Sequence, residues 1–234
     1  MVEINKHKFL LVQILKDIYS DLSLANLLGF KGGTALMLFH DLPRFSVDLD
    51  FNLLDNSKTD FVYGKIRDIV LNYGKIRDEA KKHYGMIIVL DYGQAERNLK
   101  IEISNRDFGD HYEVRNYLGI PLKIMQLPDM FAHKLCALLD RNVLTSRDIF
   151  DCHFLMQKRT PLNKEIIEER MKTDLPDYLQ RCIDALENIN EKRMLSGLGD
   201  LMDEETKRFV KTRLKQDTIA LLGMYREFPI LKEV

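Results

Sequence analysis

The chain has 234 residues, and its 35 Lys plus Arg nearly balance its 36 Asp plus Glu, so that the formal net charge is −1. With 45% hydrophobic and 30% charged residues, the composition excludes a disordered or fibrous chain and leaves ample material for a core. The near-neutral balance also excludes a protein that coats nucleic acid by bulk charge, although a local basic patch is compatible with it.

The cysteines and the apolar runs indicate the compartment. Three cysteines are too few, and odd in number, for a disulfide framework, which favours a reducing, cytoplasmic location. The N-terminal residues show no secretory signal, and no apolar run approaches the roughly 20 residues that a membrane span needs. We therefore expect a cytoplasmic protein with no membrane partner.

The start of the chain predicts helices and then a strand. Apolar residues spaced two to four apart over residues 8–28 predict one or two amphipathic helices. The glycines within residues 29–33 interrupt that pattern, and a short apolar helix is expected over residues 34–40. Strict alternation of apolar and polar side chains over residues 46–54 predicts a strand with one buried face.

The next part of the chain predicts one charged helix and three strands. Residues 58–82 have apolar positions at helical spacing and contain the hexapeptide YGKIRD twice, at 63–68 and 73–78. Two copies do not make a repeat protein, so we interpret them as a local duplication. Three shorter runs are predicted to be strands: residues 86–91, 98–104 and 118–125.

From residue 128 onward the pattern is helical. The expected helices are residues 128–140, 145–157, 163–172, 175–190 and 203–224. The change of pattern near residue 125 predicts two domains, residues 1–125 and residues 126–234. The expected fold class is α+β, with a small mixed sheet flanked by helices and then a C-terminal helical bundle.

The strongest chemical signal combines the turn Gly32-Gly33-Thr34 with Asp48 and Asp50. Two carboxylates at positions i and i+2 of a strand point to the same face, where they can bind a pair of divalent ions. A glycine turn that opens a helix offers backbone N–H groups and a positive dipole end to a phosphate. Either feature alone is common, but their ordered combination predicts metal-assisted nucleotide chemistry.

Glu102 adds a third acid on the polar face of a separate predicted strand, beside Lys100 and Ser104. A third carboxylate near a metal pair can bind one ion or accept the proton of an attacking hydroxyl. The alternative is an exposed glutamate that is simply paired with Lys100.

These residues resemble the first motif of the AbiEii/AbiGii toxin-type nucleotidyltransferases, members of the polymerase-β-like superfamily. Those proteins show Gly-Gly-Thr/Ser-Ala-Leu and then Arg-x-Ser-x-Asp-Leu-Asp-Phe, a pattern that adds Arg44 and Ser46 to the acids. The run Leu-Lys-Ile-Glu-Ile at residues 99–103 is similar to the second motif and singles out Glu102.

Two further motifs lie in the second half of the chain. The segment 127–137, with Lys134, is similar to the third motif of this family. Ser-Arg-Asp-Ile-Phe-Asp at 146–151 is similar to the fourth, and it contains Arg147, Asp148 and Asp151. Arg147 and Asp148 are two residues closer together here than in the family pattern.

The resemblance implies a nucleotidyltransferase fold and a toxin that transfers a nucleotidyl group from a nucleoside triphosphate to an acceptor hydroxyl. The acceptor would be RNA, such as a transfer RNA 3′ end, or a protein, and a separately encoded antitoxin would be the partner. The expected metal is Mg²⁺, or Mn²⁺ in its place, held by Asp48, Asp50 and Glu102.

The other roles follow from the same resemblance. The expected catalytic residues are Asp48, Asp50, Glu102, Lys134 and Asp148. The expected nucleotide-binding residues are Gly32, Gly33, Thr34, Arg44, Ser46, Lys134 and Arg147.

Several alternatives stay open. Lys134 and Asp148 are also compatible with a plain inter-helix ion pair, Arg147 with a helix cap, and Ser46 with a structural hydrogen bond. The same site, with the nucleotide bound in reverse, would serve a kinase-like phosphotransferase. A non-catalytic binding module is a third interpretation.

Two other groups of residues were weighed against function. His133, Cys136, Cys152 and His153 fit no common zinc-binding spacing, so we expect no zinc site there. Lys207, Lys211 and Lys215 step by four along the expected last helix, as a basic stripe that would contact RNA or face solvent opposite nearby acids.

Overall fold

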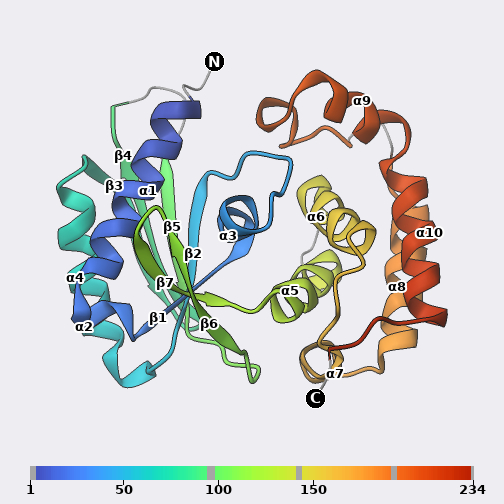
Figure 1. Ribbon diagram of the computed structural model, residues 1–234, viewed down its shortest axis with the longest axis horizontal. Coiled ribbons are helices and arrows are strands. Elements are labelled where there is room, and N and C mark those ends of the chain that lie inside the picture. Colours follow the sequence, from blue (N-terminus) through green and yellow to red (C-terminus); the bar gives the residue numbers. More distant parts are fainter. Residues whose placement is uncertain (1–3, 94–97, 141–143, 191–193, 233–234) are drawn as a thin grey trace. The chain divides into compact units, whose positions relative to one another are not determined.

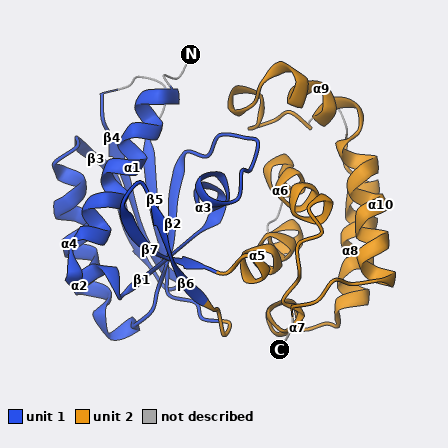
Figure 2. Cartoon of the chain, viewed as in Figure 1, with its two compact units in different colours: residues 1–107, 112–125 blue, residues 108–111, 126–234 orange. Residues whose placement is uncertain are grey.

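The computed structural model describes residues 4–93, 98–140, 144–190 and 194–232. The chain divides into two compact units (Figure 2). The first unit comprises residues 1–107 and 112–125, and the second comprises residues 108–111 and 126–234.

The first unit is built on a mixed sheet of seven strands in the order β3-β4-β5-β2-β1-β7-β6. Strands β2 and β5 pair in parallel, as do β1 and β7, and the other neighbours are antiparallel. The sheet is therefore mixed, as expected from the sequence. The strands are β1 (Leu28–Lys31), β2 (Asp48–Leu53), β3 (Lys75–Lys82), β4 (Gly85–Asp91), β5 (Leu99–Ser104), β6 (Tyr112–Tyr117) and β7 (Ile120–Met125).

Helices flank both faces of this sheet (Figure 1). On one side lie α1 (Ile4–Ser20), α2 (Leu22–Ala25) and α4 (Thr59–Leu71), and on the other lies α3 (Gly32–Phe39). A short 3₁₀ turn, η1 (Asn56–Lys58), precedes α4. The apolar stripe of α1, at the helical spacing of three and four residues, is fully buried, as are the inward residues of α4 and of the central strands. The core thus fills the side of the sheet that α1 and α4 cover.

Three strands were not expected from the sequence: β1, β6 and β3, the last of which lies in a segment expected to be helical. Strand β1 is four residues long and occupies a central position, and its residues Leu28 and Phe30 are fully buried. Strand β6 forms a hairpin with β7 through Leu118 and Gly119, which have φ values of 51° and 83°. A two-residue turn with both φ values positive normally carries Asn-Gly, and Leu-Gly gave no such signal. The third expected strand, residues 118–125, begins only at Ile120 for the same reason.

The helix expected over residues 58–82 was wrong beyond residue 71. The first YGKIRD copy lies inside α4, whereas the last four residues of the second copy begin strand β3. Strand β3 is the edge of the sheet, and its outward residues are charged, which hinders pairing with another chain. The same hexapeptide therefore adopts two structures, because different partners surround each copy.

The second unit is helical in the residues described, apart from an isolated bridge between Leu162 and Leu231. Its helices are α5 (Leu127–Asp140), α6 (Ser146–Gln157), α7 (Lys164–Met171), α8 (Leu175–Glu187), α9 (Glu204–Thr212), α10 (Leu214–Glu227) and the 3₁₀ turn η3 (Gly199–Leu201). Tyr178 on α8 is fully buried and donates a hydrogen bond to the carbonyl of Leu135 on α5, at 2.7 Å. The thiols of Cys136, Cys152 and Cys182 are all buried.

The basic stripe expected near the C terminus is not a single helical face. The expected helix 203–224 is interrupted at Arg213, which separates α9 from α10. Nζ of Lys207 lies 2.6 Å from Oε1 of Glu204. The ammonium of Lys215 donates to the backbone carbonyls of Glu187 and Ile189. The break puts Lys215 on another helix, where it binds the carbonyls that follow α8.

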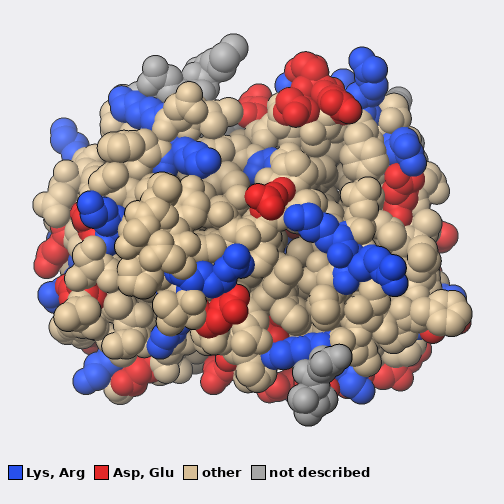
Figure 3. All heavy atoms as spheres, viewed as in Figure 1, with Lys and Arg blue, Asp and Glu red and all other residues tan. Residues whose placement is uncertain are grey.

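The distribution of surface charges agrees with the near-neutral composition. Figure 3 shows basic and acidic side chains scattered over the visible face of each unit. Within the described ranges, no helix is both long enough and apolar enough to cross a membrane.

The two glycines of the repeated hexapeptide make a matched stability test. A Cβ at Gly64, inside α4, would meet nothing within 4 Å, so Gly64→Ala should stabilise the fold by about 0.5–1 kcal/mol. A Cβ at Gly74 would overlap the backbone carbonyl of Asp91, so Gly74→Ala should destabilise the fold by about 1–3 kcal/mol. Urea unfolding measures both, and changes of the same sign would contradict the structure.

Candidate active site

The acids expected at the site lie on two neighbouring strands of the first unit. Strands β2 and β5 pair in parallel, with Asp48 opposite Lys100 and Asp50 opposite Glu102. Because residues two apart share a face and paired residues lie side by side, all four side chains are on one face of the sheet. The other face carries Leu49 and the core, so the acids are on the same side as α3.

Lys100 lies among these carboxylates. Its Nζ is 2.8 Å from Oε2 of Glu102 and 3.9 Å from Oδ2 of Asp48. Burial lowers the pKa of Lys100, but the hydrogen bond to Glu102 and the charges of Asp48, Glu102 and Asp50 outweigh burial and raise the pKa above its usual value. Lys100 therefore stays protonated at neutral pH and supplies a positive charge within the acidic group.

The donor set fits a divalent cation. Carboxylate oxygens are the hard ligands that Mg²⁺ and Mn²⁺ prefer, and Asp48, Asp50 and Glu102 provide three carboxylates on one face. In their present positions, however, no three His, Cys, Asp or Glu side chains among the described residues form a group that could hold a metal ion. The Glu102 carboxylate forms an ion pair with the ammonium of Lys100.

The glycine turn packs directly against these acids. Gly32 has a φ of +82°, and a Cβ there would overlap the carboxylate of Asp50. A Cβ on Gly33 would lie 2.8 Å from Oγ of Ser46 and 2.9 Å from Nη2 of Arg44. Glycine is thus favoured at Gly32 by its positive φ and by the lack of space beside Asp50, whereas a side chain at Gly33 would have to displace the Ser46 hydroxyl and the Arg44 guanidinium. The first motif forms one cluster at the start of α3.

Thr34 is placed differently from the sequence expectation. The residue is completely buried, and its hydroxyl donates a hydrogen bond to the backbone carbonyl of Asp48. We had expected this hydroxyl to bind phosphate. In the structure it ties the first turn of α3 to the beginning of β2.

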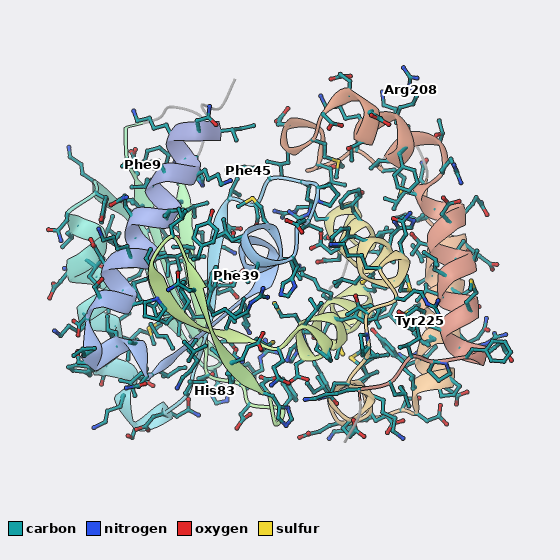
Figure 4. The ribbon with its side chains drawn as sticks, in the orientation of Figure 1. Phe9, Phe39, Phe45, His83, Arg208 and Tyr225 are labelled. Atoms are coloured by element: carbon teal, nitrogen blue, oxygen red, sulfur yellow. The ribbon has the colours of Figure 1, made fainter. Side chains whose placement is uncertain are left out.

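The segment that leads into β2 is held from several sides. His7 on α1 is fully buried and donates from Nε2 to the carbonyl of Val47 at 2.9 Å, which leaves Nδ1 to accept from the Tyr92 hydroxyl at 2.6 Å. Its ring lies edge-on to Phe45, at 5.8 Å between centroids. Phe45 is labelled in Figure 4. The backbone N–H of Ser46 donates to the sulfur of Met37 on α3. The positions of Asp48 and Asp50 therefore depend on packing from both faces of the sheet.

The remaining candidates form a separate cluster in the second unit. Nζ of Lys134, on α5, is 2.8 Å from Oδ2 of Asp151 and 3.8 Å from Oδ1 of Asp148, both on α6. The side chain of Asp151 is completely buried, and those of Asp148 and Lys134 are 4% and 17% exposed. Lys134 is thus held in place by two buried carboxylates, and Asp151 is its nearer partner.

The start of α6 shows a residue that we did not single out. Thr145 is the N-cap: its hydroxyl accepts from the N–H of Asp148 and donates to Oδ2 of Asp148 at 2.6 Å. The signal was present, since Thr-x-x-Asp before an apolar run is a capping pattern. Arg147 is half-buried in the first helical turn. The helix-cap interpretation of Arg147 was wrong, because Thr145 has that role.

The hydroxyl of Thr34 can be tested without changing side-chain volume. Thr34→Val leaves the carbonyl of Asp48 without this donor and should destabilise the fold by about 1–2 kcal/mol. Thr34→Ser retains the hydroxyl and should keep most of that hydrogen-bond energy. Urea denaturation compares the two variants, and equal losses would show that the hydrogen bond contributes nothing.

The ion pairs of Lys134 make a second test. Lys134→Met removes the ammonium beside the buried Asp151 and should cost about 3 kcal/mol of unfolding free energy. Adding Asp151→Asn removes the buried charge and should recover part of that loss. If the double variant is as unstable as the sum of the single variants, the pair is not coupled.

Known proteins provide an independent comparison. The family model described as the nucleotidyl transferase AbiEii toxin of type IV toxin–antitoxin systems matches residues 13–222. The crystal structure of JHP933 from Helicobacter pylori is similar over 98% of this chain and 94% of its own, with a TM-score of 0.61 and 21% identity. That of a proposed nucleotidyltransferase from H. pylori is similar over 98% and 97%, with a TM-score of 0.60 and 22% identity. No curated protein matches the chain.

The solved structures show a shared fold, and the family match shows more, since it spans most of the chain, including all the motifs described above. The chain belongs to the AbiEii nucleotidyl transferase toxin family of type IV toxin–antitoxin systems, and it is a nucleotidyltransferase.

Proposed function

We propose that this protein transfers a nucleoside monophosphate from a nucleoside triphosphate to an acceptor hydroxyl, in a reaction that depends on Mg²⁺ or Mn²⁺. Asp48, Asp50 and Glu102 hold the metal. Residues 1–125 are the nucleotidyltransferase domain, and residues 126–234 are a helical domain folded as a bundle.

One observation supports this assignment above the others. Three carboxylates share a face of the sheet because β2 and β5 pair in register, and the Gly32-Gly33 turn packs on that same face. Acids for a metal and backbone N–H groups at a helix start for a phosphate are the two requirements of metal-assisted nucleotidyl transfer.

The chemistry is an in-line displacement at the α-phosphorus. The acceptor oxygen forms a bond to the α-phosphorus, the bond from the α-phosphorus to the bridging oxygen breaks, and pyrophosphate leaves with that electron pair. The bound metal supplies Lewis acidity that stabilises the developing charge. Glu102 is the carboxylate on β5, and it orients the attacking hydroxyl or accepts its proton.

The other residues bind and position. The backbone at Gly32 and Gly33 holds the β- and γ-phosphates, with Arg44 and Ser46 beside it. Lys134 contacts the triphosphate, Asp148 and Asp151 orient its ammonium, and Arg147 is a further phosphate contact. Thr34 is a positioning residue, because its hydroxyl holds the backbone of Asp48.

Membership of the family supports a proposal for the acceptor and for the setting. RNA, in particular a transfer RNA 3′ end, is the acceptor that fits a toxin of this kind. The protein acts in the cytoplasm, and a separately encoded antitoxin is its partner. The near-neutral charge of −1 is compatible with brief binding of one RNA end, since the metal contributes positive charge beyond the side chains.

The test compares the transfer of label from the α-phosphate with the transfer of label from the γ-phosphate. The protein is incubated with Mg²⁺, total RNA and protein extract, and each nucleoside triphosphate carrying label at either the α- or the γ-phosphate. We expect α-label in RNA and no γ-label in any product. Asp50→Asn keeps the side-chain volume and should reduce transfer by about a hundredfold or more, because it removes a metal-binding charge.

Each alternative predicts a different outcome. Label that reaches protein only from the γ position would show a kinase-like phosphotransferase. Unchanged nucleotide consumption in Asp50→Asn would contradict the assigned site. Asp91→Asn is a control on the same face of the sheet, since Asp91 ends β4 and is not one of the proposed metal ligands.

A further inference from the structure

We propose that Lys100 is an internal counter-cation that competes with the divalent metal for Glu102 and Asp48 and thereby limits the metal affinity of the site. The inference rests on the proposed function, since it takes these carboxylates as the metal ligands.

Lys100 is positioned among the carboxylates that would bind the metal. It lies on β5 directly opposite Asp48, and its ammonium is 2.8 Å from Glu102. A cation that binds two of the three acids occupies the region where a divalent ion needs the same oxygens.

The positive charge of Lys100 opposes the binding of a divalent ion at the same carboxylates. At a partly exposed site, water screens charges about 4 Å apart only in part. A divalent ion and the ammonium therefore repel each other if both contact Glu102. Binding of a divalent ion to Glu102 therefore requires the side chain of Lys100 to move away.

The partial exposure of Lys100 and Glu102 allows this ion pair to open. The side chains of Lys100 and Glu102 are 36% and 45% exposed, so water can reach the pair and replace it. A lysine has a flexible stem and a strongly hydrated charge, and an exposed pair is worth little. Lys100 can therefore leave Glu102 without unfolding the strand.

The experiment measures metal binding without nucleotide. Mn²⁺ is titrated into the full chain, and the free ion is followed by electron paramagnetic resonance. Lys100→Met should bind Mn²⁺ about tenfold more tightly than the wild type, because a cation within 4 Å of the ligands is gone. Lys100→Arg keeps the charge and should stay close to the wild type.

Lys123→Met is the matched control. Lys123 is a half-buried lysine on β7 of the same sheet, and its Nζ contacts the carbonyl of Asn26. Its replacement should leave Mn²⁺ affinity unchanged. Equal or weaker Mn²⁺ binding by Lys100→Met would overturn the inference alone, whereas no binding by either the wild type or Lys100→Met would overturn the proposed metal site as well.

A second measurement uses the wild type and does not depend on the folding of a variant. Brief acetylation with acetic anhydride is followed by mass spectrometry, with and without Mg²⁺. If the metal displaces Lys100, its acetylation should rise severalfold with Mg²⁺ relative to Lys123. An unchanged ratio would overturn the inference.

Discussion

The parallel, in-register pairing of β2 with β5 is the constraint on which the site depends. On the core side of this pair, Leu49 and Phe51 lie opposite Ile101 and Ile103, and all four are buried. A slip of one residue would turn Glu102 into the core and the isoleucines out of it. The apolar face therefore selects the register, and the register brings Glu102 beside Asp50.

The glycine turn depends on this pairing through β1. That strand lies beside β2, and it ends at Lys31, opposite Asp50. The chain then turns at Gly32, which has no space for a side chain next to Asp50, and continues as α3. Because Thr34 binds the carbonyl of Asp48, the helix, the turn and the acids are held as one structural element. Local packing, and not the carboxylates alone, makes the arrangement specific.

The sequence predicted the strands that have one buried face and one polar face, because their apolar and polar residues alternate. Strands β2 and β5 alternate clearly, so their boundaries and the face of each acid could be inferred. Strand β1 is short and buried on both faces, and β6 is exposed along much of both, so neither alternates. The repeated hexapeptide is the sharpest case, since identical residues form a helix at 63–68 and enter a strand at 75–78. Only non-local partners, such as the Asp91 carbonyl against Gly74, distinguish the two copies.

Among the 35 basic and 36 acidic residues there are two kinds of ion pair, which differ in how far they are buried. Asp151 is completely buried beside Lys134, so separating this pair leaves a carboxylate charge in an apolar environment at a cost of several kcal/mol. Lys100 and Glu102 are partly exposed, and water compensates each charge when the pair opens. The first pair therefore works as a fixed support that orients a lysine. The second can open, and a lysine in it is suited to exchange places with a divalent cation.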